Sequence, residues 1–173
     1  MIRSKLSYLV VLASLAGCGS KSPTTTAEAK APDPKVEAAW SKLVAMLPGR
    51  WEVPLKSGKS LIVEYRATSR GSVLVETWAP GTRAETLSTL HRDHDRVLLT
   101  HYCGQGNQPR LALDSVEGNR LRFRQIDVTD LDPDESALSE LVLTLEPGTR
   151  SRNETYASAE KSDSTLMVFQ RMK

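Results

Sequence analysis

The sequence lacks an apolar run long enough to cross a bilayer as a helix. Its longest apolar stretch, from Leu6 to Ala16, is about half of the roughly 20 residues that a spanning helix needs. Aromatic residues make up only 5%, with two phenylalanines, and the basic residues are interleaved with acidic ones. Proteins that bind nucleic acid typically use a basic patch and aromatic rings for base stacking, so the composition argues against a nucleic-acid partner.

The N-terminal residues nevertheless carry a pattern for export. Arg3 and Lys5 form a basic start, a short apolar run follows, and the run closes on Leu15-Ala16-Gly17-Cys18. This quartet resembles the lipobox of bacterial lipoproteins, in which the chain is cut before the cysteine and the cysteine is acylated. The resemblance implies a signal peptide over residues 1–17 and a membrane partner reached through the acylated Cys18. By analogy with sorting in enteric bacteria, Gly19 implies the periplasmic face of the outer membrane.

Cysteine is scarce, and this limits the disulfide bonds that could stabilise the fold. Acylation of Cys18 would leave Cys103, the second of two cysteines, without an intramolecular disulfide partner. Loss of Arg3 and Lys5 with the signal peptide reduces the 23 basic residues to 21, which equals the 21 acidic residues. Residues 18–34 are small, polar and Pro-rich, which predicts a flexible tether. The mature chain is expected to be near neutral and stabilised by its core alone.

The periodicity of the remaining chain predicts one helix and then strands. Asp33 and Pro34 suit the N-cap and first turn of a helix, and apolar residues follow on one helical face: Val36, Trp40, Leu43 and Leu47. After Gly49 the period becomes two, in about ten short segments separated by turn residues. The acidic segment 127–136 is expected to hold a loop with a helical turn. We predict an all-β, antiparallel up-and-down barrel of about eight to ten strands over residues 35–173.

Two further segments carry resemblances. Gly49 and Trp51 form a G-x-W at the helix-to-strand junction, which resembles the calycin group of lipocalins and fatty-acid-binding proteins and implies a barrel that encloses a ligand cavity. Some haem-binding barrels share this start but place their iron-binding histidine near the final strands. No histidine follows His101 here, so no cofactor is expected. Thr100 to Cys103, with Gly106 to Arg110, resembles a family of small bacterial proteins of unknown function.

The T-H-Y-C segment supplies the candidate site residues. His101 and Cys103 lie two apart on a predicted strand and therefore share a face. They could act as two metal ligands or as a reactive thiol with its base, or form a buried thiol beside a hydrogen-bonded histidine. Asn107, Gln108 and Arg110 could line the barrel mouth and donate hydrogen bonds. The candidate ligand-binding residues are His101, Cys103, Asn107, Gln108 and Arg110.

A shared metal site for the three histidines is not expected. In a hairpin with an odd loop, Leu90 faces Leu98, and His91 lies beside the turn. His101 is then about four residues along the partner strand, about 13 Å away at roughly 3.3 Å per residue. A zinc ion needs each ligand nitrogen at about 2.1 Å, so one ion cannot reach both histidines. His94 is expected to be a solvated turn residue.

Three functions remain open from the sequence. Alternate residues of segments 61–66 and 73–78 mix apolar and charged side chains on both faces, so a ligand-binding interior and a solid core are both possible. The first function is an envelope binding module for a small hydrophobic or amphipathic ligand. The second is a filled barrel that acts as a scaffold or interaction protein, and the third is an enzyme that uses His101 and Cys103. We favour the first, and we expect a monomer without enzymatic activity.

Overall fold

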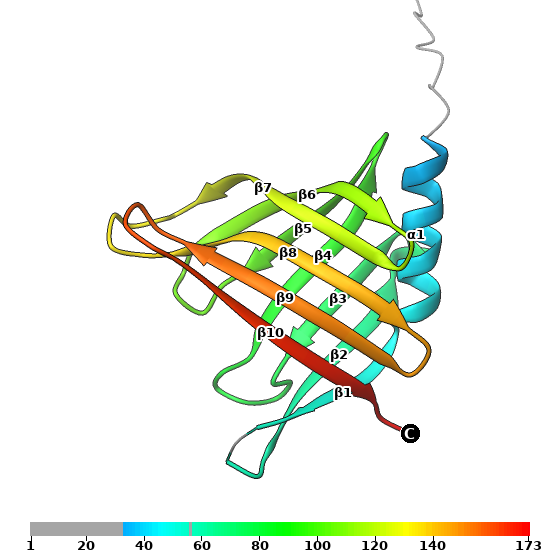
Figure 1. The fold of residues 1–173 in the computed structure, drawn as a ribbon, viewed down its shortest axis with the longest axis horizontal. Helices are drawn as coiled ribbons and strands as arrows, with labels where there is room; N and C mark the ends of the chain where they lie inside the picture. The colour runs from blue at the N-terminus through cyan, green and yellow to red at the C-terminus, as the bar shows by residue number, and fades with distance from the viewer. Residues whose placement is uncertain (1–32, 56) are drawn as a thin grey trace, which may run out of the picture.

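The structure, a computed structural model, describes residues 33–55 and 57–173 (Figure 1). The predicted signal peptide, Cys18 and most of the predicted tether lie outside these residues. Helix α1 (Pro34–Met46) precedes ten strands: β1 (Gly49–Pro54), β2 (Ser60–Thr68), β3 (Val73–Trp78), β4 (Thr86–Asp93), β5 (Arg96–Tyr102), β6 (Gln108–Glu117), β7 (Arg120–Thr129), β8 (Ala137–Glu146), β9 (Thr149–Ala157) and β10 (Ser162–Arg171). A short turn, Ser69–Gly71, joins β2 to β3. Within the described part of the chain, no helix is long and apolar enough to span a membrane.

The ten strands form a closed antiparallel barrel in which each strand pairs with its neighbours in the chain, and β1 pairs with β10. This confirms the predicted all-β up-and-down barrel with one N-terminal helix. The number of residue pairs between adjacent strands differs around the barrel wall. β1 and β10 share only the pairs Trp51–Arg171 and Glu52–Gln170, whereas β9 and β10 pair continuously from Ser162 to Gln170. We call this short β1–β10 contact the seam.

Helix α1 packs at one end of the barrel (Figure 1). Asp33 caps it, because its Oδ1 accepts a hydrogen bond from the Lys35 backbone N–H at 2.8 Å. Its buried face comprises Val36, Ala39, Trp40 and Leu43. Lys42 Nζ donates to the Gly118 carbonyl at 2.6 Å, in the β6–β7 turn. We call this the helix end, and the opposite end, where loops join β5 to β6, β7 to β8 and β9 to β10, the loop end.

The G-x-W segment (Gly49–Trp51) contacts the end of the last strand, β10. Arg171 at the end of β10 donates to the carbonyls of Met46 at 2.5 Å and Pro48 at 2.8 Å, and its guanidinium lies 4.5 Å from the Trp51 ring centroid. Gly49 has φ +128°, and a Cβ there would lie 2.7 Å from Arg171 Nη1. Glycine is therefore favoured at position 49, because this backbone angle is one that residues with a Cβ rarely adopt.

Two local predictions were wrong. Leu90 pairs with Leu99 and Asp93 pairs with Arg96, so the β4–β5 loop has two residues rather than an odd number. Sequence periodicity does not distinguish these two registers, because Leu98 and Leu99 are both apolar. Each register therefore places a leucine opposite Leu90. The acidic segment holds no helical turn: β7 runs to Thr129, and the loop after it forms a turn in which the Glu135 N–H donates to the Asp132 carbonyl at 3.1 Å.

Candidate functional site

A row of polar residues crosses four adjacent strands inside the barrel. Tyr65 of β2 pairs with Glu76 of β3, Glu76 with Ser88 of β4, and Ser88 with His101 of β5. All four are buried, with at most 5% of the residue exposed. Next to this row, toward the helix end, lies an equally continuous apolar row made of Leu74, Leu90, Leu99 and Leu111. The interior is therefore divided into an apolar half at the helix end and a polar layer beside it.

Two arginines of β9 face this row from the opposite wall. Arg152 Nη1 lies 2.5 Å from Glu76 Oε1, and its Nε donates to Glu154. Tyr65 donates its hydroxyl hydrogen to Glu76 as well. Burial alone would raise the pKa of Glu76, but the charges of Arg152 and Arg150 outweigh it and lower this pKa to about 2. Glu76 is therefore an ionised carboxylate held across the barrel interior.

Arg150 is buried in a different way. It is fully buried, and its Cζ lies 4.0 Å from the ring centroid of Phe169, 4.8 Å from that of Tyr65 and 5.4 Å from that of Trp51. Among the residues that the structure describes, none of its three guanidinium nitrogens has a hydrogen-bond partner. Burial lowers the pKa of Arg150, whereas in Arg152 the carboxylates of Glu76 and Glu154 outweigh burial and raise the pKa. The rings cover the cation but leave its N–H groups unsatisfied.

His101 closes the polar row on β5. Its Nδ1 lies 3.0 Å from Ser88 Oγ. Burial first, and the charge of Arg152 second, lower the pKa of His101, while Glu76 and Glu154 act in the opposite direction. The neutral imidazole is therefore the form that the folded protein favours.

The lowered pKa of His101 predicts a stability that falls with acidification. The unfolded chain binds a proton at His101 near pH 6.5, whereas the folded chain binds it at lower pH, so stability is lost as pH falls below about 6.5 toward the folded pKa. His101→Gln should weaken the loss of unfolding free energy between pH 7.5 and 5.5, measured by urea titration. The control is His94→Gln, since His94 is 92% exposed. An unchanged pH dependence in His101→Gln would contradict the assignment.

The other candidate residues separate into two groups. Cys103 is a half-buried free thiol at the loop end, and Asn107 is fully buried there. The Asn107 side chain donates to Glu135 Oε2 at 3.0 Å and to the Ser136 carbonyl at 3.4 Å. Asn107 therefore ties the β5–β6 loop to the β7–β8 loop.

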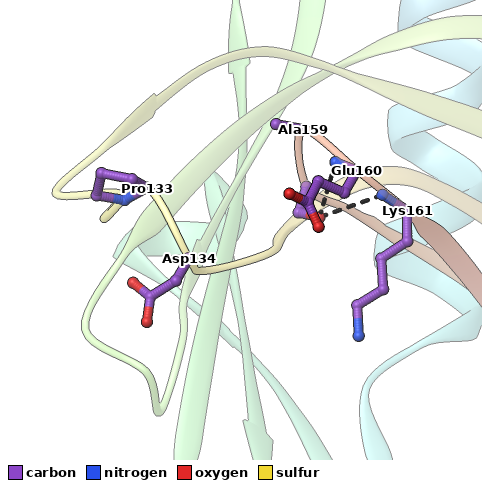
Figure 2. Close-up of a pocket in the computed structure, with 6 residues that line it drawn as sticks. Pro133, Asp134, Ala159, Glu160 and Lys161 are labelled. Atoms are coloured by element: carbon purple, nitrogen blue, oxygen red, sulfur yellow. Dashed lines mark hydrogen bonds between the residues drawn. The ribbon is translucent and has the colours of Figure 1, made fainter.

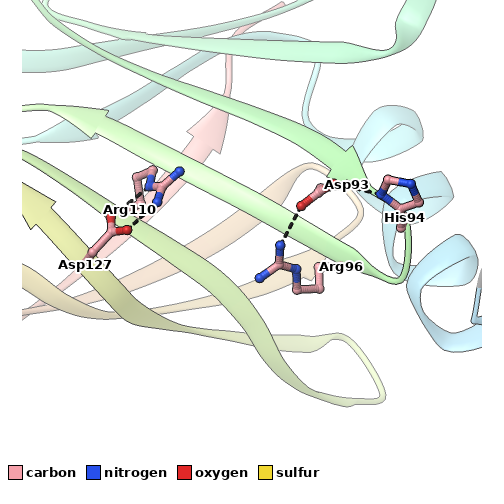
Figure 3. A network of polar contacts seen from close by, with 5 residues as sticks. All are labelled: Asp93, His94, Arg96, Arg110 and Asp127. Atoms are coloured by element: carbon pink, nitrogen blue, oxygen red, sulfur yellow. Dashed lines mark hydrogen bonds and ion pairs between the residues drawn. The ribbon is translucent and has the colours of Figure 1, made fainter.

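Gln108 and Arg110 lie on the outer wall of β6. Arg110 Nε donates to Asp127 Oδ1 of β7 at 2.7 Å, and half of the arginine side chain is exposed (Figure 3). Gln108 accepts from the Thr129 hydroxyl at 2.7 Å. His101 thus belongs to the interior cluster, while Gln108 and Arg110 form surface contacts.

The histidines of the β4–β5 hairpin lie away from the interior cluster. His94 projects from the turn, with its Nδ1 3.0 Å from Asp93 Oδ1 (Figure 3). His91 pairs with Leu98, and Ser88 with His101, so His91 and His101 occupy opposite faces of the sheet. Among the residues that the structure describes, no three His, Cys, Asp or Glu side chains gather in a way that could hold a metal ion.

A surface cavity of about 420 Å³ lies at the loop end, outside the barrel interior (Figure 2). Pro133 and Asp134 of the β7–β8 loop form one side, and residues 158–161 of the β9–β10 loop form the other. The backbone N–H groups of Glu160 and Lys161 both point to Ser158 Oγ at 3.4 Å. The cavity is bounded by loop residues, and none of the interior polar cluster lines it.

Sequence reasoning missed the residues at the centre of the cluster: Glu76, Arg150 and Arg152. A signal was present in T-R-S-R-N-E-T-Y (residues 149–156), where the charged and aromatic residues occupy one face of the strand and Ser151, Asn153 and Thr155 the other. Charged residues on a strand usually face water, so this pattern by itself favours an outward face. Arg150 pairs with Leu145 and Arg152 pairs with Leu143. Both leucines are buried in the core, and only this pairing shows that the face points inward.

Together these features define a closed β-barrel with a buried, charged interior cluster. No protein-family model matches the chain, and no curated protein sequence matches it. A solved structure with a similar course is that of Rv2717c from M. tuberculosis, at 15% identity and a TM-score of 0.49, over 82% of this chain and 99% of that one. A likeness of this size carries no functional argument. The lipobox, G-x-W and T-H-Y-C resemblances therefore stay predictions.

Proposed function

We propose that the protein is a lipid-anchored protein of the cell envelope whose barrel binds a small hydrophobic or amphipathic ligand. The observation that carries this proposal is the polar cluster inside the barrel. Buried charges are costly to desolvate, and well-packed apolar residues of similar volume are often at least as stabilising. Glu76, Arg150 and Arg152 are at most 1% exposed, so folding alone gives little reason to retain them.

An amphipathic ligand suits the arrangement of the interior. Three hydrophobic residues on the loop-end side of the polar layer, and a fourth beside Arg152, are only partly buried and pack against the core: Val53, Trp78, Tyr156 and Met167. An apolar group could lie among these side chains, with its polar end at the charged cluster. Membrane attachment through Cys18 would hold such a barrel next to a source of amphipathic molecules.

A filled barrel acting as a scaffold or interaction protein is the second candidate. The observation in its favour is that Trp51, Arg150, Arg152, Phe123 and Phe169 all lie fully buried inside the barrel. In this alternative the interior stays closed and takes up no molecule. We expect no enzymatic activity in either case, and no hydrogen bond links His101 to Cys103 in the described chain.

Binding of a neutral apolar fluorophore, N-phenyl-1-naphthylamine, tests the binding module against the scaffold. We expect fluorescence enhancement with the wild-type chain and its loss in Met167→Trp, because Met167 pairs with the inward-facing Arg152 and a larger ring at this position would occupy more of the interior. Leu166→Trp is the matched control, since its neighbour Leu166 is 65% exposed on the outer wall. The scaffold is favoured if the wild-type chain binds no fluorophore and native mass spectrometry of protein purified from its own host finds no bound molecule.

A further inference from the structure

Strand β10 has a long backbone edge that is not paired with another strand. Every residue from Ser162 to Gln170 pairs with β9, but on the other side only Gln170 and Arg171 pair with β1. β1 and β10 diverge toward the loop end (Figure 1). Among the strands that the structure describes, none pairs with this side of β10 from Ser162 to Phe169, and we call this stretch the free edge. Each residue from Ser162 to Leu166 is exposed.

The end of β10 shows which backbone groups point to the free edge. Arg171 donates its N–H to the Gly148 carbonyl on the β9 side, whereas Met172 donates its N–H to the Arg50 carbonyl of β1. These directions alternate along a strand, and the β9–β10 register runs without a shift. The residues whose N–H and C=O groups point to the free edge are therefore Ser164, Leu166 and Val168.

The free edge lacks the features that usually prevent an exposed strand from pairing. Natural edge strands carry lysine, proline or a bulge, and the neighbouring β1 ends at Pro54. The free edge contains no proline, and its one charged residue is Asp163. Its outer face carries Leu166 and Val168, which are 65% and 46% exposed. Exposed apolar side chains beside open backbone groups indicate a surface that binds another strand.

We propose that the free edge binds the free edge of a second copy of the chain, in antiparallel orientation, to form a two-fold symmetric dimer. β1 already pairs with Gln170, so the added strand can pair from Phe169 back to Asp163. A two-fold pairing over this stretch is centred on Leu166, and it places Leu166 of the two copies opposite each other. The barrel walls of the two copies then join through β10.

Charge and hydrogen bonding both fit this register. Asp163 of one copy lies opposite Phe169 of the other, so no like charges face each other along the edge. Ser164 lies opposite Val168, and these pairs together with the Leu166 pair form about six backbone hydrogen bonds. Leu166 and Val168 of both copies form one apolar cluster on the outer wall, which removes them from water. The free edge thus favours a dimer over the monomer expected from the sequence, whether or not the barrel binds a ligand.

Native mass spectrometry of the protein purified from its own host, at micromolar concentration, tests the dimer. We expect the wild-type chain to be dimeric and Leu166→Pro to be monomeric, because proline removes an N–H from the free edge and leaves the hydrogen bonds to β9 in place. Leu166→Lys should also be monomeric, since it places like charges opposite each other. Ile126→Lys is the control, because Ile126 of β7 is 46% exposed and its replacement should leave the dimer intact.

A cysteine at the two-fold axis tests the register. In a Cys103→Ser background, Leu166→Cys should form a disulfide-linked dimer on oxidation with copper phenanthroline, because paired Cα atoms in such a ladder lie about 5.5 Å apart. Ile126→Cys and the Cys103→Ser background alone should not. A monomeric wild-type chain would overturn the proposal. A dimer that persists in both Leu166→Pro and Leu166→Lys would also overturn it, as would cross-linking of Leu166→Cys no greater than that of Ile126→Cys.

Discussion

Arg152→Met is expected to destabilise the fold by about 3–5 kcal/mol, because it removes one partner of a buried ion pair. Glu76 is fully buried and Glu154 is largely buried, and both would lose their arginine. Tyr65 would remain the donor to Glu76, which does not replace a positive charge. Urea unfolding followed by tryptophan fluorescence would measure the change, since Trp51 is buried in the core and Trp78 packs against it.

Two further variants test whether the loss of stability comes from the buried ion pair. Arg122→Met removes an arginine whose ion pair with Glu140 lies on the outer wall, where the two side chains are 33% and 27% exposed, and it should cost less than about 1 kcal/mol. Glu76→Leu combined with Arg152→Met removes both ends of the Arg152–Glu76 pair and should recover the part of the loss that comes from Glu76, while Glu154 still lacks its arginine. If the free energy of unfolding of the single variant Arg152→Met is within about 1 kcal/mol of the wild-type value, the buried ion pair does not stabilise the fold as expected.

Arg150→Met is expected to have the opposite effect and to stabilise the fold by about 1 kcal/mol or more. The variant removes a buried cation with no hydrogen-bond partner within residues 33–55 and 57–173, and methionine is flexible enough to pack among the same rings. Loss of the contacts with Phe169, Tyr65 and Trp51 offsets part of the gain, because cation–π contacts contribute about 0.5–2 kcal/mol each. Loss of the positive charge that helps to keep Glu76 ionised offsets a further part. Thermal unfolding should show a rise of roughly 3–5 °C per kcal/mol for a domain of this size.

Arg150 and Arg152 form a matched pair for this comparison. They lie two residues apart on one face of β9, both fully buried, and they differ in whether a carboxylate is in reach. A loss of more than about 1 kcal/mol in Arg150→Met would mean that the wild-type guanidinium has partners inside the barrel.

The helix and the strands could be predicted because their signals are local. Asp33, Pro34 and the apolar spacing from Val36 to Leu47 determine α1 through capping and a period near 3.6. Alternation and turn residues determine that the rest of the chain is β, and a continuous meander favours a barrel. The β4–β5 register was wrong by one residue, because the length of a hairpin loop depends on the backbone angles of residues such as His94, whose φ is +54°.

The sequence by itself therefore determined the class of fold and the order of its elements, since periodicity and turn chemistry depend on near neighbours. Only the tertiary structure decided the candidate site. Alternation shows that Arg150, Arg152 and Glu154 share a face of one strand, but not that this face points inward. Closure and stagger of the barrel bring Arg152 to Glu76, 76 residues earlier in the chain, and place Arg150 behind the seam between β1 and β10. Such contacts depend on the register of every strand between the two residues. No local pattern in the sequence specifies the combined effect of all these registers.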